Sequence, residues 1–486
     1  MRWTETRGCA EVEKFTAKHG GSTLAVLGAL SLIPYGVFAV EKSTRNGILC
    51  HEVAFAAAFV LFAVAVVIAV LLPTERRGRG LLIVIAFSIL YRGMAVPNEP
   101  PRTTDPYRYI WEGKMTNLGI NPFIYPPDHP DLVGYRDDLW WDINNKSVPT
   151  VYATVSQFVF HVAYRLKPNS MATLKALFAL IDVATIFALC GLLGALGRSR
   201  MWSIVYAWHP LVVTEISLNG HQDGIGIFFL ALTCYFFARR LPLGCGLALA
   251  LSVMAKGYSL LAVPLLFLGF LRLPRRASGA PDSPQEPSPR RQSVTFLVSL
   301  TLTLVVLALP FFSPNMQCAT GLRQYLENWE RNAGIYYVVR KAASPLDDMM
   351  APIIDHLGIA SRENVSDMDT PSSPVAKGVC LALFITAFGL SMRCLSGDTE
   401  STLSRVFFVF AAFFMLSSTV YPWYICWSIP FLCVRFSPSW FLFSGLVAMN
   451  YLYRWFGGEP DWIRFSQYLP VWIGLLAEWR MSGQEC

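Results

Sequence analysis

The sequence predicts an all-α integral membrane protein, a polytopic helical bundle of about fourteen transmembrane helices (roughly 12–14). Three observations support this fold class. The 486 residues are 54% hydrophobic and only 15% charged, which is low for a soluble domain. Apolar runs such as Val53–Leu72, which contains no charged residue, are long enough to cross a hydrocarbon core of about 30 Å. Basic residues flank many of these runs, as they do at the cytoplasmic ends of membrane helices.

The basic turns predict the orientation. The strongest are Arg76, Arg77 and Arg79; Arg198 and Arg200; and the Pro- and Ser-rich stretch from Arg272 to Arg291, with Arg239–Arg240, Arg393 and Arg435 as weaker members. Placing them in the cytoplasm puts both termini there too. The expected helices lie near residues 22–40, 52–72, 81–97, 171–196, 201–218, 222–238, 242–256, 258–271, 293–312, 376–394, 404–419, 421–435, 438–453 and 464–480.

The chain divides into five predicted parts. They are an N-terminal three-helix membrane segment (1–97), a first extracytoplasmic loop (98–170), central membrane helices (171–312) with a cytoplasmic linker (272–292), a second extracytoplasmic loop (313–375) and C-terminal membrane helices (376–486). The first loop is long and rich in Trp, Tyr and Pro, so we expect a folded functional element carrying short helices and not a linker. Val151–Leu166 within it fits an interfacial helix. The short pair of helices around Lys256 fits a re-entrant hairpin as an alternative to two spans.

The first loop opens with a charged motif. Asp105, Arg108 and Glu112 in DPYRYIWEG are spaced three and four residues apart, which places them on one face of a short helix. GINPFIYPP follows this motif. A solvated pair of charges near the membrane surface is the alternative interpretation.

A second polar motif lies farther along the chain, in HPLVVTEISLNGHQDG. Glu215 lies inside an apolar run, where an ionisable residue is costly and commonly functional. Asn219, His221 and Asp223 form a polar turn on the outer side, for which an ordinary helical hairpin is the alternative interpretation.

Three further segments carry polar or aromatic side chains at predicted outer helix ends. Lys256 in AKGYSLLAVPLL either reaches to the interface or holds an anion. YLENWERNAGIYY in the second loop contributes Trp329, Arg331 and Asn332. YPWYICWSIPFL is also explained by an aromatic belt.

In this order, the five segments resemble the multi-span glycosyltransferases of the GT-C superfamily, and most closely the bacterial polyprenyl-phosphate-mannose-dependent mannosyltransferases. The resemblance covers roughly Asp105–Pro430. It implies a GT-C-like fold and a hexosyltransferase that moves a sugar, mannose in the nearest relatives, from a polyprenyl phosphate to an acceptor hydroxyl outside the cytoplasm. It also implies residence in the bacterial cytoplasmic (inner) membrane.

The resemblance assigns roles to residues of this chain. Asp105 matches the family's active-site aspartate, and a positioned carboxylate can take the proton of the attacking hydroxyl. A single displacement would invert the anomeric centre. The basic candidates for the leaving phosphate are Arg108, His221, Lys256 and Arg331. The expected sugar and acceptor pocket comprises Tyr107, Trp111, Glu112, Glu215, Asn219, Asp223, Tyr258, Trp329, Asn332, Tyr421 and Trp423.

Several other site types are not expected. The DxD motif Asp367–Asp369 lies in a Ser- and Pro-rich external loop and is interpreted as solvated, so neither a metal nor a cofactor is predicted. The eleven cysteines lack metal-ligand spacing. The net charge of +7 is explained by basic residues that are expected in cytoplasmic loops. No nucleic-acid partner is therefore expected. The first twenty residues lack the pattern of a signal peptide.

The alternative from another class is a polytopic transporter or lipid flippase, which many spans and intramembrane charges would also suit. Transporters commonly contain inverted repeats and polar sites near the midplane. This sequence shows no clear repeat, and its polar motifs gather at one face. A donor carrying glucose or arabinose is a further alternative. The expected partners are the lipid bilayer, the lipid-linked sugar, and a glycolipid, polysaccharide or protein acceptor.

Overall fold

A computed structural model of the chain describes residues 7–40, 45–274, 287–311, 320–356 and 373–483. The described residues are helical, and an isolated bridge between Arg331 and Thr419 is their only strand-like pairing. Seven of the described helices are long and apolar enough, by length and composition, to cross a membrane. The prediction of a helical membrane protein is therefore confirmed, whereas the predicted number of about fourteen spans stays a prediction.

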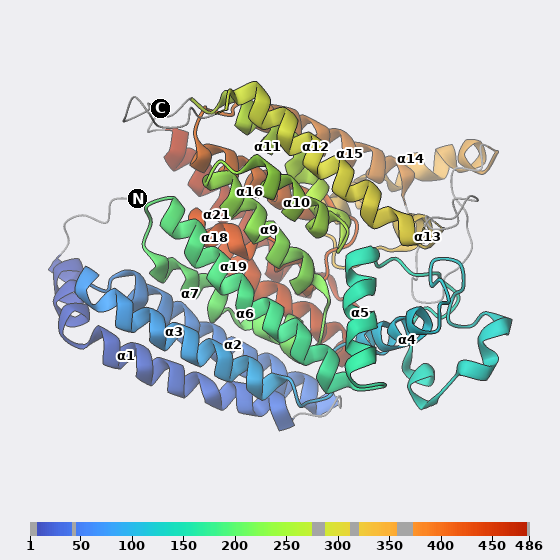
Figure 1. Cartoon of the computed structure of the whole chain (residues 1–486), viewed down its shortest axis with the longest axis horizontal. Coiled ribbons are helices and arrows are strands. Elements are labelled where there is room, and N and C mark those ends of the chain that lie inside the picture. Colours follow the sequence, from blue (N-terminus) through green and yellow to red (C-terminus); the bar gives the residue numbers. More distant parts are fainter. Residues whose placement is uncertain (1–6, 41–44, 275–286, 312–319, 357–372, 484–486) are drawn as a thin grey trace.

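The seven long helices that meet this criterion belong to the expected set and lie roughly along one direction (Figure 1). They are α1 (Arg7–Val40), α2 (Arg45–Val70), α3 (Thr74–Ala95), α6 (Met171–Ala195), α12 (Pro289–Ala308), α15 (Pro374–Arg393) and α16 (Thr399–Leu416). Beside them lie α9 (Asp223–Ala238), α10 (Pro242–Val253), α11 (Val263–Arg272), α19 (Pro438–Leu446), α20 (Tyr453–Phe456) and α21 (Asp461–Gly483).

Two segments expected as continuous helices are broken. Residues 201–218 divide into α7 (Ile204–Ala207), α8 (Pro210–Val212) and a π-helix (Val213–Leu218). Residues 421–435 divide into α17 (Pro422–Ile425) and α18 (Ile429–Val434). Prolines explain both breaks, since Pro210 and Pro430 lack the N–H that a helix interior needs. Short 3-10 turns, Gly257–Ala262 and Val447–Leu452, similarly open α11 and extend α19.

The basic turns meet at one end of the bundle, hereafter the basic end. The Arg198 guanidinium at the end of α6 pairs with Glu400 at the start of α16 and donates to the carbonyl of Val434 at the end of α18. The Arg272 guanidinium at the end of α11 donates to the carbonyls of Met392 and Leu395. The start of α1 and the end of α21 lie toward the same end (Figure 1).

The opposite end carries both long loops and is hereafter the loop end. The first loop contributes α4 (Asp105–Asn117) and α5 (Thr154–Leu166), and the second contributes α13 (Thr320–Asn328) and α14 (Ile335–His356) (Figure 1). The first loop has its own hydrophobic core, in which Trp111, Met115, Leu132, Trp140 and Ile143 are buried. The expectation that it is a folded element carrying short helices is therefore confirmed.

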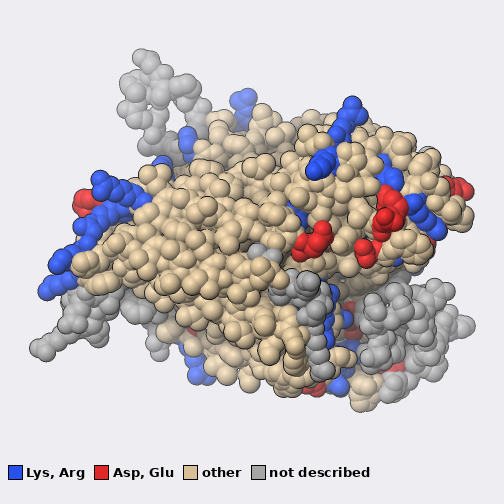
Figure 2. All heavy atoms as spheres, turned by 90° about the horizontal axis from the view of Figure 1, so that it is seen from below, with Lys and Arg blue, Asp and Glu red and all other residues tan. Residues whose placement is uncertain are grey.

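The surface between the two ends is largely uncharged. In the view of Figure 2, Lys and Arg side chains gather at the left end, and acidic and basic side chains mix at the right. A broad surface with few charged side chains lies between them. Helices α12 and α15 present exposed apolar side chains along their length, such as Leu302, Val306 and Leu381. Such a surface fits a hydrocarbon environment.

Candidate functional site

Asp105 is held at the first turn of α4, at the loop end. Its backbone N–H donates to Thr103 Oγ1 (3.1 Å), and Asn144 Nδ2 donates to its Oδ1 (2.7 Å). A carboxylate is favourable at this place because the N-terminus of a helix carries partial positive charge. The side chain is 19% exposed. Asp105 is therefore oriented by neighbours and still reachable from outside.

The other charges of α4 are turned inward. Arg108 Nε donates to Glu112 Oε1 (2.8 Å), and its two amino groups donate to the carbonyls of Asn145 (2.9 Å) and Val148 (2.6 Å). Glu112 Oε2 accepts from Thr150 and Gln157. Both charged side chains are buried. Arg108 and Glu112 share a helix face, as their spacing predicts, but the pair is buried and not solvated. The guanidinium, expected as a phosphate partner, instead holds the first loop through the carbonyls of Asn145 and Val148.

The segment carrying Glu215 is shaped by the break at Pro210. The His209 ring accepts from the N–H of Leu211 (3.2 Å), and the π-helix follows. The wider turn allows His221 N to donate to Glu215 O across six residues (2.9 Å). π-Helical turns occur frequently at functional sites because they redirect side chains within a helix.

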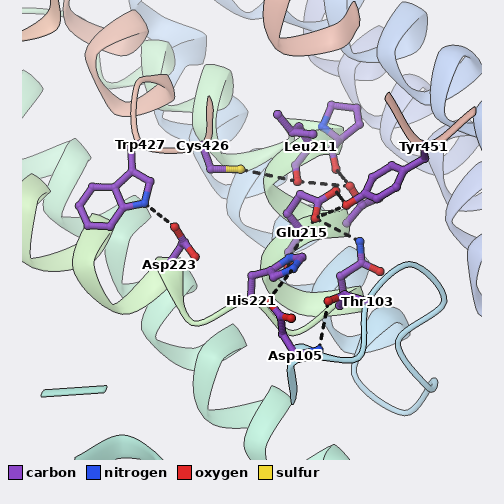
Figure 3. Close-up of polar contacts among 12 residues, drawn as sticks. Thr103, Asp105, Leu211, Glu215, His221, Asp223, Cys426, Trp427 and Tyr451 are labelled. Carbon is purple, nitrogen blue, oxygen red and sulfur yellow. Dashed lines mark hydrogen bonds and ion pairs between the residues drawn. The ribbon is translucent and has the colours of Figure 1, made fainter. Parts of the chain in front are cut away.

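Glu215 and Asp105 lie on opposite edges of the His221 ring (Figure 3). His221 Nδ1 is 3.0 Å from Glu215 Oε2, and Nε2 is 3.9 Å from Asp105 Oδ2. Glu215 also accepts from Tyr451 (3.0 and 3.1 Å) and Asn219 (3.1 Å). The Nε2 atom is buried and has no hydrogen-bond partner. The imidazole can therefore take or give a proton on the side that faces Asp105.

Glycine and aromatic side chains fix the geometry of this cluster. Gly220 adopts a positive φ of 72°, and a Cβ there would lie 3.1 Å from Pro106, so the turn needs glycine to approach Asp105. The Trp423 ring stacks on His221, with centroids 3.9 Å apart. Tyr421 stacks in turn on Trp423 (4.4 Å). Trp423 and Tyr421, both expected in the pocket, thus stack over one face of the His221 ring.

Lys256 lies beside the neighbouring carboxylate Asp223. Its Nζ is 2.7 Å from Asp223 Oδ1, which also accepts from Trp427 Nε1 (2.6 Å). The ammonium lies 4.4 Å from the ring centre of Tyr424 and 5.1 Å from that of Tyr258. Asp223 is buried, and the Lys256 side chain is 21% exposed. Lys256 is thus paired but retains access to the outside.

The second loop reaches this region indirectly. Arg331 exchanges backbone hydrogen bonds with Ser418 and Val420, just before Tyr421. Its guanidinium lies 2.8 Å from Glu459 and over the Tyr453 ring. Arg331 therefore docks the loop onto the strand-like segment that leads to the stacked aromatics.

The remaining expected residues have supporting positions. Asn332 donates to Gln467 (3.0 Å) at a positive φ of 46°, and the Trp329 carbonyl accepts from Thr419 (2.7 Å). Trp111 is part of the core of the first loop. Tyr107 donates to Glu99, and burial together with that carboxylate raises the pKa of Tyr107 to about 12, so its hydroxyl stays a donor.

The contacting residues that were not anticipated include Asn144, Tyr451 and Trp427. None belongs to a recognisable motif of charged residues, and each reaches the site from another part of the chain. Of these three residues, only Trp427 lies in one of the motifs that predicted the site, YPWYICWSIPFL.

No group of His, Cys, Asp and Glu side chains that could hold a metal occurs within the described ranges. The Asp367–Asp369 motif lies outside the described residues. No family model, curated protein or solved structure matches the chain. The site itself presents a reachable carboxylate, an imidazole backed by a second carboxylate, and a nearby ammonium.

Proposed function

We propose that the chain is a membrane glycosyltransferase with a GT-C-like fold and about fourteen spans. It transfers a sugar, mannose by resemblance, from a polyprenyl phosphate to an acceptor hydroxyl at the loop end. The observation that carries the proposal is the reachable Asp105 carboxylate, held by Asn144 and facing the unpartnered nitrogen of His221.

The proposed reaction is a single displacement. Asp105 takes the proton of the acceptor hydroxyl, and the oxygen of that hydroxyl forms a bond to the anomeric carbon. The bond from that carbon to the phosphate oxygen breaks, and the phosphate leaves with the electron pair. Attack opposite the leaving group inverts the anomeric centre. His221, with Glu215 behind it, can then relieve Asp105 of its proton.

Lys256 is the best placed cation for the leaving phosphate, because part of its ammonium side chain is accessible. Arg108 is committed to the first loop. An ammonium pairs well with phosphate as a point charge. Exchanging part of the contact with Asp223 for a phosphate contact would keep the lysine charge paired throughout the reaction.

An apolar cavity supports a lipid-linked donor. A cavity of about 140 Å³ lies between α14, α15 and α16, and Leu381 in its lining is 58% exposed on the flank of the bundle. Phe413 of this lining contacts the Tyr258 ring, with centroids 5.6 Å apart, and Tyr258 lies beside Lys256. An isoprenoid chain in the cavity would therefore direct its phosphate toward the lysine.

The test measures sugar transfer from polyprenyl-phosphate mannose by the purified protein. Asp105→Asn should reduce sugar release from polyprenyl-phosphate mannose by about 10²–10⁴-fold, because the amide cannot accept the proton. Asp131→Asn, at a 74% exposed carboxylate of the same loop, is the matched control and should retain activity. Full activity of Asp105→Asn would contradict the assignment of the base. If the wild-type chain moves the intact lipid across vesicles without releasing sugar, it is a flippase.

A further inference from the structure

A second, polar cavity lies at the basic end, far from the proposed reaction. Its volume is about 330 Å³, and it lies where the ends of α6 and α18 meet the start of α16. The lining consists of Arg198, Glu400, Ser401, Ser404, Arg405, Val434 and Arg435. Three arginines thus surround one glutamate.

One arginine and the glutamate of the lining pair with each other. Arg198 makes two parallel contacts with Glu400, of 3.0 and 2.8 Å, and its remaining amino group donates to the Val434 carbonyl. The only acidic side chain of the lining is therefore already neutralised. Any further positive charge in the cavity has no protein counter-charge there.

Arg405 and Arg435 supply that further charge. Neither has an ion pair or a side-chain hydrogen bond to another described residue. Arg405 is half-buried and Arg435 is exposed. The Ser404 hydroxyl lies beside them in the lining. Two planar guanidinium groups and a hydroxyl form a donor set that matches the oxygens of a phosphate.

The surroundings favour a phosphate carried by a lipid. Phe408 follows Ser404 and Arg405 by one turn of α16, so it lies on the same helix face, and it is 47% exposed. Phe436, 37% exposed, lies next to Arg435 and packs against Trp202. A charged cavity therefore borders exposed apolar and aromatic side chains, which is how head groups and acyl chains are placed at a membrane interface.

We propose that this cavity binds the phosphate of an anionic phospholipid, with Arg405 and Arg435 on the head group and the acyl chains along Phe408. The bound lipid would bridge α16 and the end of α18, which Arg198 and Glu400 already join. This site is independent of the proposed glycosyl transfer and stands if that proposal fails.

The test compares binding of phosphatidylglycerol and phosphatidylcholine to the purified full chain in detergent, measured by native mass spectrometry. Arg405→Gln/Arg435→Gln should weaken the affinity for phosphatidylglycerol by at least about tenfold, because each basic residue near the head groups attracts anionic lipid. Arg79→Gln/Arg290→Gln removes the same charge from exposed positions at the basic end outside the cavity. This control should change the affinity by less than about twofold.

A second variant guards against misfolding. Ser404→Trp fills the cavity while leaving both arginines in place, and it should also lose the bound lipid. Equal losses in the two double variants would overturn the proposal in favour of diffuse attraction to the basic end. Unchanged binding in the Arg405 and Arg435 variant would overturn it outright. If glycerol 3-phosphate alone competes at matching affinity, the ligand is a soluble phosphate ester and the lipid assignment is wrong.

Discussion

Two clusters of polar side chains contact the broken helix of residues 200–218, and they differ in how fully their charges are paired. In the Arg92 cluster, Arg92 Nε lies 2.6 Å from Asp182, whose other oxygen accepts from Tyr206. Arg92 also donates to Ser88 and to the Ala207 carbonyl. One positive and one negative charge balance, and all of these side chains are buried.

In the Asp105 cluster, two carboxylates face a single imidazole. Glu215 is buried and saturated by hydrogen bonds, whereas Asp105 is partly exposed. Between them, His221 Nε2 has no partner. Arg92 Nη2 is likewise buried without a hydrogen-bond partner, so an unpaired nitrogen is common to both clusters. What distinguishes the Asp105 cluster is that its unpaired nitrogen lies beside a carboxylate that is partly exposed.

Breaking the Arg92 cluster should have the largest effect on folding. Arg92→Leu leaves the Asp182 carboxylate buried without its counter-charge, which costs about 3–5 kcal/mol. We expect a strongly lowered thermal unfolding midpoint in detergent. Replacing both residues, as Arg92→Leu/Asp182→Leu, should restore much of the loss, because no unpaired charge remains. If the double variant is as unstable as the single one, the cluster does not act through charge pairing.

Changing the Asp105 cluster should reduce turnover and leave folding almost intact. If the proposed transfer holds, His221→Gln removes the proton acceptor beside Asp105 and should lower kcat by about a hundredfold. His129→Gln, at a histidine of the first loop outside the cluster, is the control. The measurement is kcat together with the unfolding midpoint. A loss of stability as large as that of Arg92→Leu would show that His221 serves folding instead.

The sequence was sufficient for the parts of the molecule that depend on local spacing. Hydropathy located the helical segments, and the basic turns identified the end where Arg198 and Arg272 now lie. The spacing of Arg108 and Glu112 predicted that they share a helix face, and the two side chains form an ion pair there.

What the sequence could not provide depends on contacts between distant segments. Arg108 was expected to face a phosphate, but its amino groups bind the carbonyls of Asn145 and Val148, and backbone acceptors leave no side-chain pattern. His221 faces Asp105 only because the turn at Gly220 packs closely against the start of α4 at Pro106. Tyr451 reaches Glu215 from the far end of the chain, with no motif around it.

Asn144 offers the finest test of the comparison, because it changes only how Asp105 is held. Asn144→Ala removes the 2.7 Å hydrogen bond to Asp105 Oδ1. One such bond contributes about 0.5–1.5 kcal/mol, so we expect a roughly two- to tenfold lower kcat. Asn144 is only half-buried, so the unfolding midpoint should stay near that of the wild type. Asn144→Gln, which can still donate, should recover part of the activity. If KM rises while kcat is unchanged, Asn144 contacts substrate and does not orient the carboxylate.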